Sequence, residues 1–94
     1  MDKRIKLVDR ERDAALRQEL FQGVIAGKLT IAQAVKLMQK ISHLTQPEFA
    51  AHRRISVQAL RQVISGKGNP TVETLNKIAD IFGLEVGFVP KRKL

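Results

Sequence analysis

Residues 44–84 have the sequence LTQPEFAAHRRISVQALRQVISGKGNPTVETLNKIADIFGL, and this stretch decides the fold. Thr45, Ser56 and Thr71 each precede a helix-forming run, and their hydroxyls can accept hydrogen bonds from the amides of a first helical turn. Residues 66–70 (Gly-Lys-Gly-Asn-Pro) are typical of a tight turn. The stretch therefore predicts three consecutive short helices joined by tight turns.

Two more helices are predicted upstream of this stretch. Residues 30–33 (Thr-x-x-Gln) repeat the capping-box pattern of residues 45–48 (Thr-x-x-Glu), and apolar residues with helical period follow them. An earlier helix is predicted from Asp9 or Asp13 to about Gly27. The fold class predicted is all-α, a compact bundle of about five helices.

The earlier helix has an apolar face. Leu16, Leu20 and Val24 are four residues apart, and Phe21 lies beside them on a helical projection. Two interpretations of this face remain open. It packs on the core of its own chain, or it forms a surface for a second copy or a partner protein.

The C-terminal residues alternate between apolar and other side chains. Val86 and Phe88 alternate with Glu85 and Gly87, which predicts a short half-buried strand. Because a lone strand leaves unpaired edges, we expect it to pair either with residues 4–8 or with its copy in a homodimer. The predicted organisation is an arm and amphipathic helix over 1–29, a helix-turn-helix domain over 30–84, and a strand with a basic tail over 85–94.

The composition excludes several classes of site. The 94 residues include no cysteine, so disulfides and thiolate metal sites are excluded. No apolar run approaches the roughly 20 residues of a membrane span, and the N-terminus lacks the apolar core of a secretory signal. We therefore expect a cytoplasmic protein that does not contact membranes.

Positive charge is concentrated in the middle of the chain. The whole chain has 17 Lys and Arg against 9 Asp and Glu, a net charge of +8. Residues 30–69 contain six bases and one acid, a net charge of +5, whereas residues 1–29 are nearly balanced. Such a surface favours a polyanion as partner, the alternative being a merely soluble basic protein. Only four aromatic residues are present, which argues against a base-stacking platform for single strands.

The spacing of the helices points to double-stranded DNA. Two helices over 45–52 and 56–65, joined by a short turn, can set the second in the major groove while the first crosses the backbone. Glutamine can bind adenine, arginine prefers guanine, and small apolar side chains can contact the thymine methyl. The residues expected to contact bases are Val57, Gln58, Ala59, Arg61 and Gln62. Those expected to contact phosphates are Thr45, Gln46, Arg53, Arg54, Ser56, Lys67, Gly68 and Asn69.

Catalysis has no support in the sequence. Ser42, Ser56 and Ser65 have no coherent base and orienting group around them, and two of the three are explained by helix ends. His43 and His52 are expected at the surface. We expect no enzymatic activity, cofactor or metal.

Residues 44–84 resemble the Cro/C1-type (XRE) helix-turn-helix family, in register and without a gap. The matching residues are Leu44-Thr45-Gln46, Glu48-Phe49-Ala50, Ile55-Ser56, Leu60, Gly66-Lys67, Asn69-Pro70-Thr71, Glu73-Thr74-Leu75 and Ile78-Ala79. The resemblance implies a lambda-repressor-like domain that binds a palindromic operator as a homodimer. The ending Gly-Leu-Glu-Val-Gly-Phe-Val-Pro-Lys resembles HipB- or HigA-type antitoxins, in which a strand follows the last helix.

The chain departs from the family at the turn between the two helices. The family usually has an apolar residue followed by glycine, where this chain has Arg53 and Arg54. A left-handed conformation at Arg54 would cost roughly 1 kcal/mol relative to glycine. These arginines either contact DNA phosphates or carry solvated charge. Only Gln58, Arg61 and Gln62 are long polar side chains on the second helix.

Three functions are compatible with these patterns. The first is a bacterial DNA-binding repressor, the antitoxin of a toxin–antitoxin pair that represses its own operon. The second is a protein-interaction module that neutralises a toxin, with weak or secondary DNA binding. The third is a stand-alone phage or host regulator.

Overall fold

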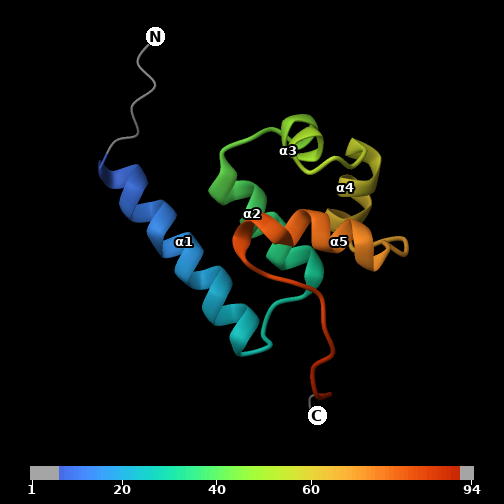
Figure 1. Cartoon of the computed structure of the whole chain (residues 1–94). Helices are drawn as coiled ribbons and strands as arrows, with labels where there is room; N and C mark the ends of the chain where they lie inside the picture. The colour runs from blue at the N-terminus through green and yellow to red at the C-terminus, as the bar shows by residue number, and fades with distance from the viewer. Residues whose placement is uncertain (1–6, 92–94) are drawn as a thin grey trace.

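The computed structural model describes residues 7–91, with side chains from Arg10 onward. Five α-helices and one 3-10 turn follow one another, and no strand occurs in this range (Figure 1). The prediction of an all-α bundle of about five helices is therefore confirmed. The elements are α1 (Leu7–Ile25), α2 (Ile31–Ser42), α3 (Gln46–His52), α4 (Val57–Ser65), α5 (Val72–Ala79) and η1 (Asp80–Phe82).

The predicted capping residues begin four of the helices. At Thr30 the hydroxyl accepts a hydrogen bond from the amide of Gln33 (3.1 Å), whose side-chain oxygen accepts one from the Thr30 amide (2.9 Å). Thr45 forms the equivalent reciprocal pair with Glu48. Ser56 and Thr71 each accept a hydrogen bond from the third amide of the following helix. These bonds satisfy amides that have no partner within the helix, which is why each helix begins where it does.

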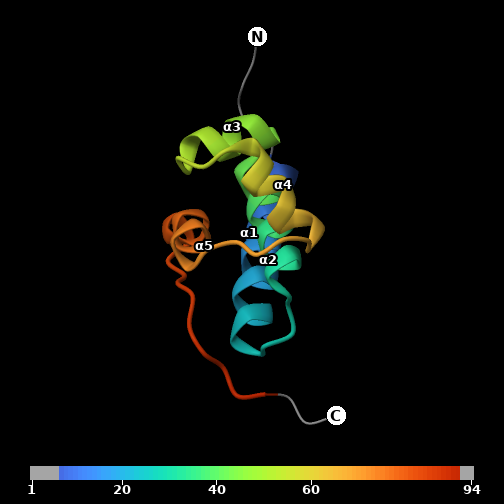
Figure 2. The ribbon, with the colours of Figure 1, turned by 90° about the vertical axis from the view of Figure 1, so that its right-hand side faces the viewer.

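Among the described residues, one apolar core lies between the helices. α2 packs against α1, α3 and α4, and its apolar side faces the core through Val35, Met38 and Ile41. Figures 1 and 2 show α1 running alongside α2, with α5 on another side of the bundle. The side chains that are completely buried come from four helices, α1, α3, α4 and α5: Leu20, Phe49, Leu60 and Ile78.

The apolar face of α1 is divided between core and surface. Leu20 is completely buried and Leu16 is half-buried against the core, as expected for a helix that packs on its own chain. Leu20 therefore leaves no surface for a partner. Phe21 and Val24 each keep 37% of their surface exposed, and Ile25 is mostly exposed. The helix begins at Leu7, earlier than the expected Asp9 or Asp13.

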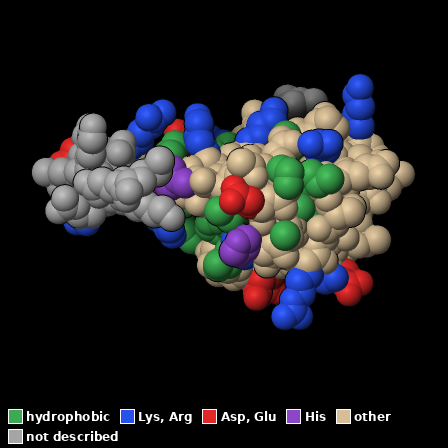
Figure 3. Space-filling model, turned by 90° about the horizontal axis from the view of Figure 1, so that it is seen from above, with side chains coloured by type: hydrophobic (Ala, Val, Ile, Leu, Met, Phe, Trp, Pro, Cys, Tyr) green, Lys and Arg blue, Asp and Glu red, His purple; other side chains and the backbone are tan. Residues whose placement is uncertain are grey.

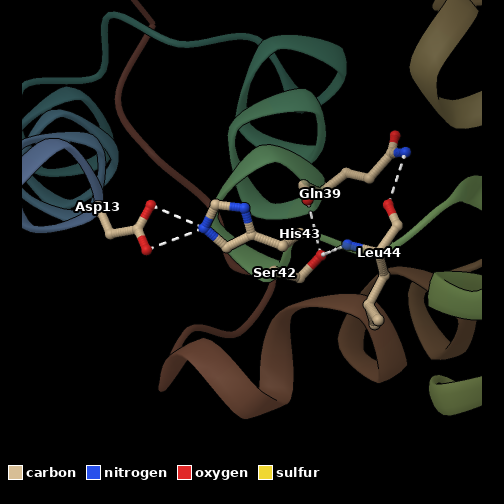
Figure 4. Close-up of polar contacts among 5 residues, drawn as sticks. All are labelled: Asp13, Gln39, Ser42, His43 and Leu44. Carbon is tan, nitrogen blue, oxygen red and sulfur yellow. Dashed lines mark hydrogen bonds and ion pairs between the residues drawn. The ribbon is translucent and has the colours of Figure 1, made fainter. Parts of the chain in front are cut away.

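The segment between α2 and α3 is held by side-chain hydrogen bonds (Figure 4). The hydroxyl of Ser42 donates to the carbonyl oxygen of Gln39 (2.6 Å) and accepts from the amide of Leu44 (3.4 Å). The side-chain amide of Gln39 donates to the carbonyl oxygen of Leu44 (3.3 Å). Because His43 between them is in the left-handed conformation, the chain turns sharply into α3.

The prediction of a C-terminal strand is wrong for the described residues. Leu84 and Val86 are half-buried in alternation, as expected, but Phe88 and Val89 are exposed and the segment forms no ladder. The Val86 amide donates instead to the side-chain oxygen of Asn76 on α5 (2.8 Å). A strand needs a neighbouring strand, and the described part of the chain supplies none. Of the proposed partner segment 4–8, the last two residues belong to α1 and the others lie outside the described range.

Candidate nucleic-acid interface

The turn between α3 and α4 takes an unusual residue at its left-handed position. Arg54 has φ 57°, a conformation that favours glycine. The amide of Ile55 donates to the carbonyl oxygen of Ala50 (3.0 Å), so the chain closes tightly after α3. Ser56 then caps α4. The turn thus has an arginine in a left-handed conformation that a glycine would adopt without strain.

Arg53 lies against the core. Its guanidinium carbon is 5.0 Å from the centre of the Phe49 ring, which is the geometry of a cation–π contact. Its Nε atom is buried and has no hydrogen-bond partner among the described residues. Burial lowers the pKa of this guanidinium below its usual value, because the charged form loses hydration. The phosphate contact expected of Arg53 stays a prediction.

α4 has one buried and one exposed side. Leu60 and Val63 are buried in the core, and this fixes the rotation of the helix. Val57 is half-buried and packs against the core, and Ala59 is also half-buried. The structure brings the three long polar residues together on the exposed side: Gln58, Arg61 and Gln62.

A side-chain hydrogen bond joins the exposed side of α4 to the first residue of α3. The Nε atom of Arg61 donates to the side-chain oxygen of Gln46, at a distance of 3.1 Å. The two residues are 15 positions apart in the sequence. Arg61, expected to contact a base, and Gln46, expected to contact a phosphate, are therefore joined by a direct hydrogen bond.

A glycine turn follows α4. Gly66 and Gly68 have φ of 75° and 79°, and the Lys67 between them is exposed. A Cβ atom added to Gly68 would lie 3.5 Å from the side-chain oxygen of Gln62, so this turn lies directly beside the exposed side of α4. Asn69 is exposed in the same turn.

A model of the helix-turn-helix family matches residues 35–89, which is more than half of the chain.

The chain belongs to the Cro/C1-type helix-turn-helix family. It is therefore a sequence-specific DNA-binding regulator, and α4 occupies the place of the recognition helix. Comparison with curated proteins and with solved structures gave no match.

Two basic residues of this helix-turn-helix protein were not assigned to DNA from the sequence. Lys36 and Lys40 on α2 line one shallow hollow with Gln46 and Ile64. Figure 3 looks down on the end of the molecule that carries α3 and α4, and several Lys and Arg side chains lie along the upper edge in this view, with others at the lower edge. In the sequence, the i, i+4 spacing of the two lysines indicated only that both lie on the polar side of α2. The packing of α2 against the rest of the bundle places them beside α3.

Other kinds of site have no candidate in the described part of this helix-turn-helix protein. Residues 7–91 contain no group of three His, Cys, Asp or Glu side chains placed to hold a metal ion. No described helix has the length and apolar character needed to cross a bilayer. Both histidines are exposed, as expected.

Proposed function

We propose that this DNA-binding regulator is a homodimeric repressor that binds a palindromic operator through α4. The observation that carries the proposal is the exposed side of α4, where Gln58, Arg61 and Gln62 lie together. Glutamine recognises adenine N6 and N7, and arginine recognises guanine O6 and N7. Val57 and Ala59 lie at the half-buried margin of the same helix, where their methyl groups can contact thymine.

Phosphate contacts are proposed on both sides of this helix. Lys67 and the backbone of Gly68 and Asn69 lie at one end, where the exposed turn allows close approach of a DNA strand. Lys36 and Lys40 extend the basic surface along α2 beside Gln46. The remaining proposed phosphate contacts are at the start of α3, in the turn and at the start of α4: Thr45, Arg53, Arg54 and Ser56.

An apolar groove supports the homodimer. It has a volume of about 210 Å³ and lies between α1, α2, α5 and the C-terminal segment, with Val24 and Val86 among its walls. Phe88 and Val89 are exposed directly beyond it. Each chain therefore has both a groove and apolar side chains that could fill the groove of a second copy. In such a dimer the two α4 helices would meet half-sites about 34 Å apart.

Selection from a random duplex library, followed by titration, tests the operator proposal. We expect a palindromic consensus and an affinity that falls steeply with salt, with a logarithmic slope near −0.9 for each phosphate neutralised. Sedimentation of the protein with the selected duplex should show two chains per site. Equal binding of the selected and a scrambled duplex at physiological salt would overturn the proposal.

A second candidate function is the antitoxin of a toxin–antitoxin pair. The exposed apolar residues at the end of α1, above all Phe21 and Ile25, favour a protein partner on this side. Co-expression with the product of the neighbouring gene tests this function. Because deleting α1 would also remove Leu20 from the core, the sharper variant is Phe21→Ser with Ile25→Ser, with Glu19→Ser, on another face of α1, as the control. Unchanged copurification by the double variant would exclude this surface as the partner site.

A further inference from the structure

We propose that Gln46 is a positioning residue that aims Arg61 at a guanine, so that base recognition depends on α3 as well as α4. The inference rests on the proposed function, because it assumes that α4 faces the bases. It goes further by assigning a role in specificity to a residue otherwise expected only to contact phosphate.

The geometry of the pair carries the first step. The Nε atom of Arg61 donates to the side-chain oxygen of Gln46 at 3.1 Å, and Arg61 is otherwise exposed. No carboxylate forms a salt bridge with Arg61 among the described residues. A guanidinium is planar and its donors form a rigid fork. Fixing Nε therefore restricts the direction of the whole group and leaves the two terminal nitrogens to donate.

The chemistry of the terminal nitrogens gives the second step. Two parallel donors match the O6 and N7 acceptors of guanine in the major groove, and no other base offers two acceptors there. An arginine that moves freely can also turn toward phosphates or toward the single acceptor of another base. Holding the fork in one direction therefore favours guanine over the alternatives.

The support of Gln46 itself gives the third step. Gln46 is half-buried and directly follows Thr45, whose reciprocal hydrogen bonds with Glu48 fix the first turn of α3. Lys36 and Lys40 line the same hollow. While its oxygen accepts from Arg61, the amide nitrogen of Gln46 can still donate to a phosphate. A DNA strand held by the lysines would thus meet a side chain that is already connected to the base contact.

The test compares how each variant discriminates among bases. A duplex library selected with the wild-type protein defines the consensus, and Arg61→Ala identifies the guanine, as the position where preference is lost. A bidentate arginine discriminates against a wrong base by roughly 5- to 150-fold. We expect Gln46→Ala to reduce this ratio roughly three- to tenfold at that position alone, within the coupling range of contacting residues. The double variant should show the same profile as Arg61→Ala.

Gln46→Glu separates positioning from phosphate binding. Its carboxylate still accepts from the Nε atom of Arg61, but it repels phosphates. We expect it to keep the guanine preference while weakening binding to all duplexes. Gln18→Ala, which removes an exposed glutamine side chain from α1, is the matched control and should change neither quantity.

Failure of the proposed function and failure of this inference give different results. If wild-type protein selects no consensus, the proposed function fails. If wild-type protein selects a consensus but Gln46→Ala weakens all duplexes equally, Gln46 only contacts phosphate and this inference is overturned. Loss of the guanine preference in Gln46→Glu would overturn it as well. Thermal melting of each variant shows that the comparison is made between folded proteins.

Discussion

The Nε2 atom of His43 lies 2.9 Å from both carboxylate oxygens of Asp13, which joins the end of α2 to α1 across 30 positions of sequence (Figure 4). Asp13 keeps 19% of its side-chain surface exposed and His43 keeps 56%. Leu20 attaches α1 to the core further along the helix. α1 is thus held to the bundle both by its buried leucine and by this pair. The His43 end of the pair lies in the short segment that leads into α3.

Removing the pair should loosen α1 by a small amount. Asp13→Ala and His43→Asn each remove one partner, and asparagine tolerates the left-handed conformation of residue 43. We expect a coupling energy of about 0.2–1 kcal/mol, typical of partly exposed pairs, from a double-mutant cycle in urea. Glu11→Ala, at an exposed site on the same helix, is the control. A zero coupling energy would show that the pair does not hold α1.

Glycine at position 54 should stabilise the protein. Arg54 has φ 57°, and relief of this strain should raise the free energy of unfolding by about 0.5–1 kcal/mol. For a chain of this size the melting temperature should rise by roughly 2–8 °C. Ala51→Gly, on the exposed side of α3, should lower stability by a similar amount, because its backbone is helical. A melting temperature lowered by Arg54→Gly would mean that the arginine makes a compensating contact.

An apolar residue at position 53 should also be stabilising. Arg53→Leu removes the buried Nε that has no partner among the described residues, at the expense of the contact with Phe49. The balance favours the variant by about 1 kcal/mol, measured by urea unfolding. Arg12→Leu, at an exposed site on α1, is the control and should change stability little. Titration of Arg53→Leu with operator DNA at several salt concentrations then separates the two roles expected for Arg53, since a phosphate contact predicts weaker binding with a salt dependence reduced by about one phosphate.

Acid should weaken the start of α3. Hydrogen bonds from the backbone amide and the hydroxyl of Thr45 lower the pKa of the Glu48 carboxyl, with a smaller effect from His52. The ionised form is favoured in the folded state, so its contribution is present above the ordinary carboxyl pKa of about 4.3 and lost as pH falls through the lowered value.

The matching variant is Glu48→Gln, which can still cap the helix but does not titrate. We expect the wild-type protein to lose more stability than this variant between neutral pH and about pH 3, followed by urea midpoints. Glu19→Gln at an exposed site on α1 controls for general effects of charge. Parallel pH profiles for wild type and Glu48→Gln would contradict the assignment.

Substitutions on α4 and in the following turn should affect DNA binding in different ways. Gln58→Ala or Gln62→Ala should cost about 1–3 kcal/mol on the selected operator and relax its sequence preference. Lys67→Ala should weaken selected and scrambled duplexes about equally and reduce the salt dependence by roughly one phosphate. Fluorescence anisotropy at several salt concentrations measures both effects. Unchanged operator binding by both glutamine variants would show that another side of α4 faces the bases.

The helix starts illustrate how far local sequence reaches. Thr30, Thr45, Ser56 and Thr71 begin helices as predicted, because each accepts a hydrogen bond from an amide only three residues away. The prediction of a C-terminal strand was wrong because a strand depends on residues far away in the sequence. Alternation correctly indicated that Leu84 and Val86 are half-buried, but a strand also requires a distant partner, and the Val86 amide binds Asn76 instead.

The sequence alone determined the helices, the family resemblance and the set of polar residues on α4, since periodicity and capping depend on near neighbours. Only the tertiary structure decided how these parts are connected. Packing of Leu60 and Val63 turned Gln58, Arg61 and Gln62 outward. Packing between helices brought Gln46 against Arg61, placed Lys36 and Lys40 beside α3, and set Asp13 against His43. Contacts across 15 or 30 positions depend on how buried apolar surfaces fit together, and no local pattern specifies that fit.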